Sequence, residues 1–289
     1  MPYMKLPVYN LPFIAAAICL LPLSFSQRHQ SYDNRAGVPE WQVDSEFKQD
    51  VFTFARVKYT STRGGGGHGG WGYGRRGGRG GGGWQTDYPD AELNFAYRLQ
   101  QMTSLKVNPD STVVELTQRD LFNYPFLYIV EPGRLIFLEE EVTALREYLL
   151  NGGFLMVDDF WGDSEYDNFH YEISRVFPER EPVEIPIEHP IFHMVFDLEE
   201  KPQVPSAGHA IGARRAGYGT VSNQGPGTEE VHYKAIFDDN GRIMCIICHN
   251  TDLGDGWERE GEDEWYFREF AEKKAYPMGI NIIFYALTH

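Results

Sequence analysis

Residues 152–162 read Gly-Gly-Phe-Leu-Met-Val-Asp-Asp-Phe-Trp-Gly, a short apolar run that opens on two glycines and ends on two aspartates. Such a run is typical of a strand that is buried on both faces in a parallel sheet. In open α/β sheets, ligands bind just beyond the carboxyl ends of the strands. The stretch therefore predicts a buried strand whose polar end, Asp158 and Asp159, lies at a binding crevice.

Strand and helix patterns alternate on both sides of this run. Strands are predicted at residues 51–59, 112–116, 126–131, 182–187, 233–237 and 242–248, the last two forming a hairpin around an Asn-Gly turn. Helices are predicted at residues 88–99, 139–150, 163–177 and 278–287, and residues 199–230 look irregular. Alternating strands and helices indicate an α/β protein with a mostly parallel sheet and right-handed crossovers.

The N-terminus has the features of a secretory signal peptide over residues 1–26. One cation, Lys5, precedes an apolar stretch at 11–25, and Ser24 and Ser26 supply small residues at the −3 and −1 positions of a cleavage site. The stretch is too short to span a bilayer comfortably, so an uncleaved anchor is the lesser alternative. We expect a secreted or periplasmic protein with no transmembrane span after cleavage. Residues 27–50 predict a mobile lead-in, and 51–289 a single α/β domain.

The charge balance argues against nucleic acid as a partner. The chain has 42 acidic and 26 basic residues, a formal net charge of −16. Residues 63–84 form a glycine-rich segment with four arginines. Arginine–glycine segments with aromatic residues can bind single-stranded nucleic acid, but four arginines are a small footprint. We expect a flexible, solvated loop within the domain.

Two cysteines follow the expected signal peptide. Cys245 and Cys248 are three positions apart on a predicted strand, which places them on opposite faces. We expect buried, unpaired thiols and no disulfide framework. The chain also lacks a Gly-x-Ser-x-Gly elbow and a P-loop, so the sequence offers little support for nucleophilic catalysis or a phosphate cradle.

Polar clusters follow the predicted strands or precede the predicted helices, and a doubly wound sheet would bring them to one rim. Their members are Asp87, Tyr88, Asp90, Glu92, Glu131, Asp158, Asp159, Trp161, His249, Asn250, Asp252 and Asp255. Several carboxylates and a histidine at one rim predict a ligand-binding site. Adjacent strand residues point to opposite faces, so one of the paired aspartates can instead be a structural helix cap.

Asp159 and His249 are the candidate catalytic residues, as acid and base partners. A histidine held by a loop carbonyl is the structural alternative for His249, and Asn250 and Asp252 equally fit a turn. Asp159, His249 and Asp252 also supply ligand atoms for a divalent metal, although no local spacing such as His-Glu-x-x-His is present. No other cofactor is predicted. His189 and His193 flank a short turn and fit capping or packing.

Five motifs in order resemble the DUF4159 domain, a bacterial family of unknown function. They are WQTDYPDAELNF at 84–95, VEPG at 130–133, GGFLMVDDF at 152–160, HPIF at 189–192 and HNTDLGD at 249–255. The resemblance covers about residues 51–289 and implies a flavodoxin-like three-layer α/β/α sandwich. The DUF4159 family resembles class I glutamine amidotransferases and ThuA-like trehalose-utilisation proteins in fold.

The comparison with amidotransferases also implies a difference in chemistry. Their corresponding strand ends on a nucleophilic cysteine, where this chain has Asp159, and their histidine corresponds to His249. The missing cysteine removes thioester chemistry, so glutamine hydrolysis is not expected.

Three functions remain open from the sequence. The first is binding of a small polar ligand, such as a carbohydrate-like polyol, at a rim of carboxylates and aromatics that include Tyr88, Trp161 and Trp257. The second is a hydrolase of unknown substrate, with metal assistance as an option. The third is an interaction module that binds another envelope protein through residues 63–84 or 199–230.

Overall fold

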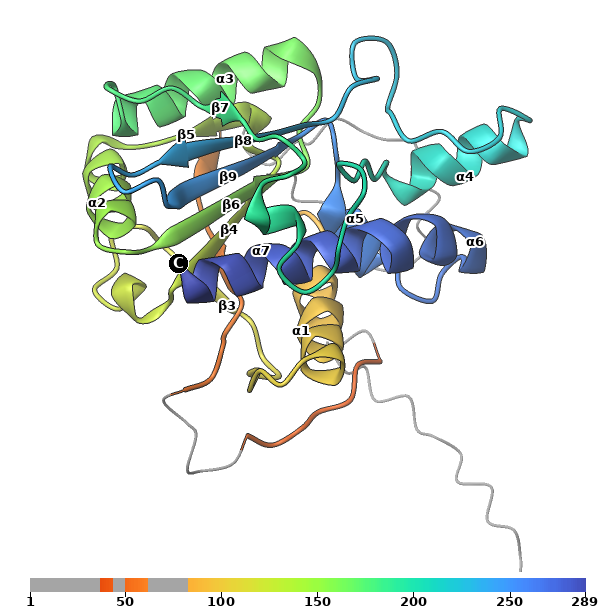
Figure 1. The fold of residues 1–289 in the computed structure, drawn as a ribbon, viewed down its shortest axis with the longest axis horizontal. Helices are drawn as coiled ribbons and strands as arrows, with labels where there is room; N and C mark the ends of the chain where they lie inside the picture. Colours follow the sequence, from red (N-terminus) through yellow and green to blue (C-terminus); the bar gives the residue numbers. More distant parts are fainter. Residues whose placement is uncertain (1–36, 44–49, 62–82) are drawn as a thin grey trace, which may run out of the picture. The chain divides into compact units, whose positions relative to one another are not determined.

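A seven-stranded sheet with the order β3-β1-β4-β6-β9-β8-β7 forms the centre of the domain (Figure 1). The structure, a computed structural model, describes residues 37–43, 50–61 and 83–289. Neighbouring strands are parallel from β3 to β9, and β8 is antiparallel to both β9 and β7. The strands of this sheet are β1 (Ala55–Val57), β3 (Thr112–Val114), β4 (Phe126–Val130), β6 (Phe154–Asp158), β7 (Val183–Glu184), β8 (His232–Phe237) and β9 (Ile243–His249).

Helices cover both faces of the sheet, which confirms the predicted three-layer α/β/α class. The buried side chains of α2 (Glu139–Leu150) and α3 (Gly162–Val176) join the apolar core on one face. Those of α1 (Asp90–Met102), α5 (Leu253–Glu258) and α7 (Tyr276–Thr288) join the core on the other. The remaining elements are the two-stranded sheet β2 (Thr60–Ser61) with β5 (Leu135–Ile136), the helices α4 (Ala207–Arg215) and α6 (Glu264–Tyr266), the π-helix η5 (Phe267–Ala275), and the 3₁₀ turns η2 (Leu121–Asn123), η3 (Pro132–Arg134) and η4 (Pro190–Phe192).

The strand predicted from the opening stretch is β6, and it lies near the middle of the sheet. All five of its residues are buried, because β4 and β9 flank it and helices cover both faces. Its register pairs Val130 with Asp158, and Val157 with Ile247. The carboxyl ends of β4, β6 and β9 therefore meet at one edge of the sheet, as the parallel topology requires.

Several further expectations are confirmed. The Asn-Gly turn joins β8 and β9 in an antiparallel hairpin. Cys245 and Cys248 are buried free thiols in the cores on opposite faces of the sheet. His189 caps η4, since its Nδ1 accepts a hydrogen bond from the Ile191 N–H at 3.2 Å.

Two expectations about secondary structure are wrong. The segment 199–230 is not wholly irregular, because it contains α4, which Ser206 caps by accepting a hydrogen bond from His209 N–H. Two glycines within α4 hide its helical pattern. The single strand expected at 51–59 is shorter, since only Ala55–Val57 joins the main sheet and Thr60–Ser61 pairs elsewhere. Alternation predicts extended chain but does not determine its partner.

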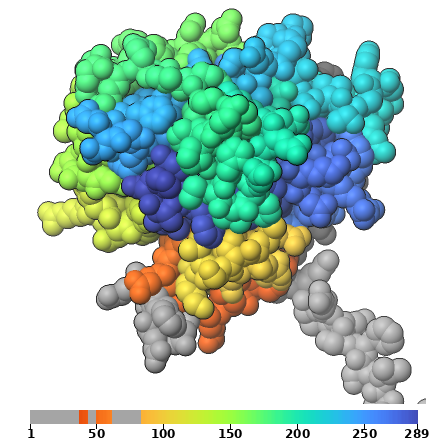
Figure 2. Space-filling model, in the orientation of Figure 1, coloured from red at the N-terminus to blue at the C-terminus, as the bar shows by residue number. Residues whose placement is uncertain are grey.

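The segment after η4 packs over α7, as Figure 2 shows for the teal-green surface against the dark blue of the C-terminal helix. The fully buried Asn281 of α7 joins the two. Its side-chain oxygen accepts hydrogen bonds from the Val195 and Phe196 N–H groups at 2.8 Å each. The middle of this helix is therefore covered by that segment, whereas its last residues, Leu287 and Thr288, are exposed.

Other expectations fall on residues that the structure does not describe. The signal peptide at 1–26 and nearly all of the glycine-rich segment at 63–84 lie outside the described residues. Within the expected lead-in, the Trp41 indole N–H donates to the Val107 carbonyl at 2.8 Å. In the described parts of the chain, every helix is too short or too polar to cross a bilayer.

Candidate functional site

Four non-glycine residues of the described chain have a left-handed backbone, and all four belong to the predicted rim. The φ angles are 61° at Asp87, 48° at Glu131, 58° at Asp159 and 59° at Asn250. The last three directly follow β4, β6 and β9. This conformation costs a residue with a Cβ about 1–2 kcal/mol, and strained residues of this kind cluster at functional sites. The chain thus turns sharply where three neighbouring strands end.

The double-aspartate tip and the histidine–asparagine turn meet at this edge, as the sequence predicts. The Asp159 N–H donates to the Thr251 carbonyl at 3.2 Å, and the Asn250 N–H donates to the Phe160 carbonyl at 3.0 Å. Phe160 and Thr251 form an antiparallel bridge. The two segments therefore hold each other through backbone hydrogen bonds.

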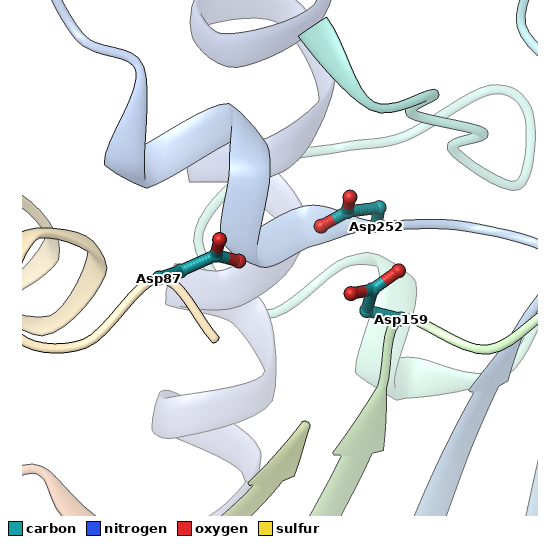
Figure 3. A group of neighbouring side chains, drawn as sticks. All are labelled: Asp87, Asp159 and Asp252. Atoms are coloured by element: carbon teal, nitrogen blue, oxygen red, sulfur yellow. The ribbon is translucent and has the colours of Figure 1, made fainter. Parts of the chain in front are cut away.

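Three aspartates from separate segments converge above this edge (Figure 3). Asp87 comes from the turn before α1, Asp159 follows β6, and Asp252 is the N-cap of α5. One carboxylate oxygen from each lies within 4.8 Å of the others. Asp252 is buried and the other two are half-buried. We call these three residues the aspartate trio.

The trio is electrostatically unfavourable as it stands. Burial raises the pKa of each of the three carboxyls well above its usual range, and neighbouring carboxylates raise it further. Asp159 and Asp87 both act on Asp252, whereas Asp87 also faces Glu258 and Asp255. Like charges this close favour the neutral forms of the carboxyls, or a bound cation that offsets the repulsion.

Asp158 lies beneath the trio and is fully buried. Its Oδ2 accepts hydrogen bonds from the Tyr128 hydroxyl at 3.1 Å and from the Gly254 N–H at 3.0 Å. Burial raises its pKa to about 7, against these hydrogen bonds, which lower it. Two oxygens here, Asp158 Oδ1 and Asp87 Oδ2, are buried without a hydrogen-bond partner among the described residues.

Gly254 lies between these groups and leaves no room for a side chain. A Cβ at this position would come within 2.8 Å of the Tyr128 hydroxyl and 3.1 Å of Asp87 Oδ2. We expect Gly254→Ala to lower the free energy of unfolding by about 1–3 kcal/mol, because an overpacked site must shift its neighbours. Urea unfolding measures this.

Gly208→Ala in α4 is the matched control, since a Cβ there meets nothing within 4 Å. The helix should gain about 0.5–1 kcal/mol from that change. Equal stability of the Gly254 variant and the wild type would contradict the tight packing around Gly254.

A second acidic group, formed by Asp87, Asp255 and Glu258, is already partly neutralised. The Arg259 side chain lies 3.1 Å from Asp255 Oδ1 and also pairs with Glu258. The other Asp255 oxygen accepts a hydrogen bond from the Ala207 N–H. Arg259 therefore offsets part of the charge of this group, whereas the main charged neighbours of Asp159 and Asp252 are carboxylates.

A family model described as Domain of unknown function (DUF4159) matches residues 53–287, which is most of the chain. The protein belongs to the DUF4159 family. Among curated proteins, none matches this sequence. All three members of the trio lie inside the matched region.

The DUF4159 domain carries one rim residue that the sequence analysis did not single out, Arg56 of β1. It is fully buried, and its Nε donates to Glu92, which is buried as well. The predicted ligand-binding residue Glu92 therefore has a charged protein partner. The signal in the sequence was a cation on the apolar face of an otherwise alternating strand.

His249 lies in a different environment from the trio. Its Nε2–H donates to the Gly162 carbonyl at 3.1 Å, and its ring packs near Phe160, Tyr166 and His232. Burial lowers the pKa of His249 to about 4. Among the described residues no hydrogen bond joins His249 to Asp159. The sequence suggested Asp159, His249 and Asp252 as metal ligands, whereas the aspartate trio contains Asp87 in place of His249. The role of His249 in the DUF4159 protein remains a prediction.

Other predicted site residues hold the rim together. The Trp161 indole N–H donates to Asp159 Oδ1 at 3.1 Å, and Glu131 Oε2 accepts from the Gly83 N–H at 2.6 Å. Asn250 Oδ1 accepts from the Gly162 N–H at 2.8 Å, and its amide donates to the Glu230 carbonyl. These contacts order the loops around the trio.

The aromatic residues expected at the rim divide into two groups. Tyr88 and Trp161 are half-buried and follow Asp87 and Asp159 closely in the sequence. Asp90, also half-buried, begins α1, and burial raises its pKa. Trp257 is only 1% exposed, and its ring lies 4.5 Å from that of Phe95, so the expectation that it lines the rim is wrong.

Proposed function

We propose that the DUF4159 domain binds a divalent metal ion between Asp87, Asp159 and Asp252, and through it a small polar ligand. The convergence of three carboxylates from three separate segments carries this proposal. A bound cation would attract all three carboxylates and so offset their mutual repulsion. It would supply the positive charge that the trio lacks. The buried, unpartnered Asp87 Oδ2 is an acceptor that such an ion would satisfy.

The ligand atoms favour a hard cation. All three side chains offer oxygen, which suits Mg²⁺, Ca²⁺ or Mn²⁺ better than the softer metals that prefer thiolate or imidazole. Because Asp87 and Asp159 are half-buried, an ion held between them would have one side that the described residues do not enclose. That open side supports exchange of water for oxygen atoms of a ligand.

A carbohydrate-like polyol is the ligand that we propose for this open position. Hydroxyl groups coordinate hard cations as water does, and the half-buried Tyr88 and Trp161 offer apolar faces beside the carboxylates. The features of residues 1–26 support a secreted or periplasmic location for this activity.

Metal-assisted hydrolysis of the ligand is the second candidate. Asp158, with a pKa raised to about 7 by burial, can hold or release a proton at neutral pH beside the trio. Thiol chemistry has no such support, because burial raises the pKa of Cys248 well above its usual range and both described cysteines lie within β9. Chromogenic esters, phosphates and glycosides, tested with and without Mn²⁺, would reveal hydrolysis.

Metal binding is tested by calorimetric titration of the purified protein with Mg²⁺, Ca²⁺ and Mn²⁺, together with thermal unfolding. We expect at least one ion to bind and to raise the melting temperature. At a free ion concentration of 100 times the Kd, binding should raise the free energy of unfolding by about 2.7 kcal/mol. Asp159→Asn should weaken binding by about 100-fold, since it removes one of the three charged ligands. Asparagine tolerates the left-handed backbone of position 159, so the variant isolates the charge.

Asp167→Asn is the matched control, because Asp167 is exposed on α3 and the change in charge is the same. It should bind metal like the wild type. If the wild type binds none of the three ions, or if Asp159→Asn binds them equally well, the proposed site is wrong.

A further inference from the structure

Arg56 is a charged residue in the middle of β1 that is 0% exposed. Its guanidinium lies over the rings of Tyr128, at 5.1 Å, and Tyr88, at 5.7 Å. Glu92, which is also buried, accepts from its Nε. Burying an ion pair costs free energy, because both charges lose their contact with water. The other hydrogen bonds of Arg56 therefore indicate which part of the structure the pair stabilises.

Those remaining hydrogen bonds go to two backbone carbonyls that lie just before Asp87 in the sequence. Nη1 of Arg56 donates to the Trp84 carbonyl at 3.1 Å and to the Thr86 carbonyl. Tyr88, the residue after Asp87, packs its ring against the same guanidinium. Arg56 therefore spans the turn that carries Asp87 in its left-handed conformation.

The charge of Arg56 also acts on Asp87. Burial raises the pKa of Asp87 and nearby carboxylates add to it, whereas Arg56 opposes them. The second terminal nitrogen of Arg56, Nη2, is buried without a hydrogen-bond partner among the described residues. The guanidinium thus has a spare donor that Glu92 and the backbone carbonyls do not use.

We propose that Arg56 is the positioning residue of the metal site, which holds the turn at 84–88 so that Asp87 points toward Asp159 and Asp252. This inference rests on the proposed function. Glu92 orients the guanidinium, and the guanidinium holds the two carbonyls. The turn then directs the carboxylate of Asp87 toward those of Asp159 and Asp252, which Figure 3 draws together. The fork of the guanidinium matters here, since a lysine has no two planar donors to share between Glu92 and the carbonyls.

Positioning and simple electrostatics predict opposite signs. Replacing Arg56 alone removes a positive charge near the trio, which by Coulomb's law should tighten the binding of a cation. Loss of positioning should weaken it. The double variant Arg56→Met with Glu92→Met removes the pair without changing the net charge, and it leaves no buried charge unpaired.

The experiment is a calorimetric titration with Mn²⁺ of four proteins: the wild type, Asp87→Asn, the Arg56/Glu92 double variant and the triple variant. We expect the double variant to bind Mn²⁺ at least 10-fold more weakly, as for other residues that orient metal ligands. With Asp87 already replaced, the Arg56/Glu92 change should have little further effect. Such non-additivity shows that Arg56 acts through Asp87, which a general loss of stability would not produce.

The same double change in the exposed pair Glu264–Arg268 is the control and should leave Mn²⁺ affinity unchanged. Should the Arg56/Glu92 variant fail to fold, Arg56→Lys decides, because it keeps the charge and should still bind at least 10-fold more weakly. Wild-type affinity in either folded variant, or additive effects in the cycle, overturns the positioning role alone. A wild type that binds no Mn²⁺ instead overturns the metal site itself.

Discussion

Replacing Asp158 with asparagine is expected to change how the stability of the metal-free protein depends on pH. The native pKa of Asp158 is raised to about 7 by burial, above the value of about 4 in the unfolded chain. Between these values the native state binds more protons than the unfolded state. The contribution of the Asp158 carboxyl to the free energy of unfolding is therefore present below about pH 4. It is lost as the pH rises toward 7, at up to about 1.4 kcal/mol per pH unit.

The pH dependence of stability must be compared between the wild type and Asp158→Asn, because titration of His249 changes the stability of both in the opposite direction. Burial lowers its pKa to about 4, so its contribution to stability rises with pH between about 4 and 6.5. Asp158→Asn keeps an oxygen that accepts from Tyr128 and Gly254, yet it cannot titrate. The stability of the wild type minus that of the variant should fall steadily between pH 4 and 7.

Urea unfolding in the presence of a chelator, at half-unit steps of pH, measures this difference. Asp167→Asn, with an exposed side chain, should give a profile parallel to that of the wild type. Saturating metal should raise stability most at the high end of the range, because the ion competes with protons for the trio. A difference that is constant with pH would show that Asp158 titrates normally.

Asn250→Ala is expected to lower the free energy of unfolding by about 3 kcal/mol. The change removes two partly buried side-chain hydrogen bonds, which contribute about 1 kcal/mol each. Their partners are the Gly162 N–H and the Glu230 carbonyl, each 2.8 Å away. Alanine must also adopt the φ angle of 59°, which costs about 1 kcal/mol.

Asn250→Gly separates the two causes, since glycine adopts this backbone without strain. It should be less destabilised than Asn250→Ala by about 1 kcal/mol, when measured by urea unfolding. If both variants were as stable as the wild type, Asn250 would not hold the rim together. A role in ligand binding, as its position in the sequence first suggested, would then be the better explanation.

The sequence predicts the sheet well because its central strands have unambiguous patterns. The apolar run of β6, the amphipathic period of α2 and the turn between β8 and β9 are all local signals. Parallel topology then requires the residues after β4, β6 and β9 to share an edge. Asp158, Asp159 and Asp252 could be assigned to one rim on that reasoning alone.

Local patterns could not decide which side chains converge there. The direction of a side chain beyond a strand depends on the turn that follows, and Asp159 turns with a left-handed backbone that periodicity does not encode. The path of the 84–88 turn, which brings Asp87 to the trio, depends on hydrogen bonds from Arg56 on a different element. His249, by contrast, lies at the end of β9 and takes the face of the sheet that the strand's alternation assigns to it, beside Phe160 and Tyr166.

By itself, then, the sequence determined an α/β sheet and the edge at which polar residues collect, because both follow from periodicity and from the polarity of parallel strands. Only the tertiary structure decided that Asp87, Asp159 and Asp252 meet while His249 does not. The physical reason is that convergence depends on contacts between distant segments. Such contacts are set by packing and buried hydrogen bonds rather than by neighbours along the chain.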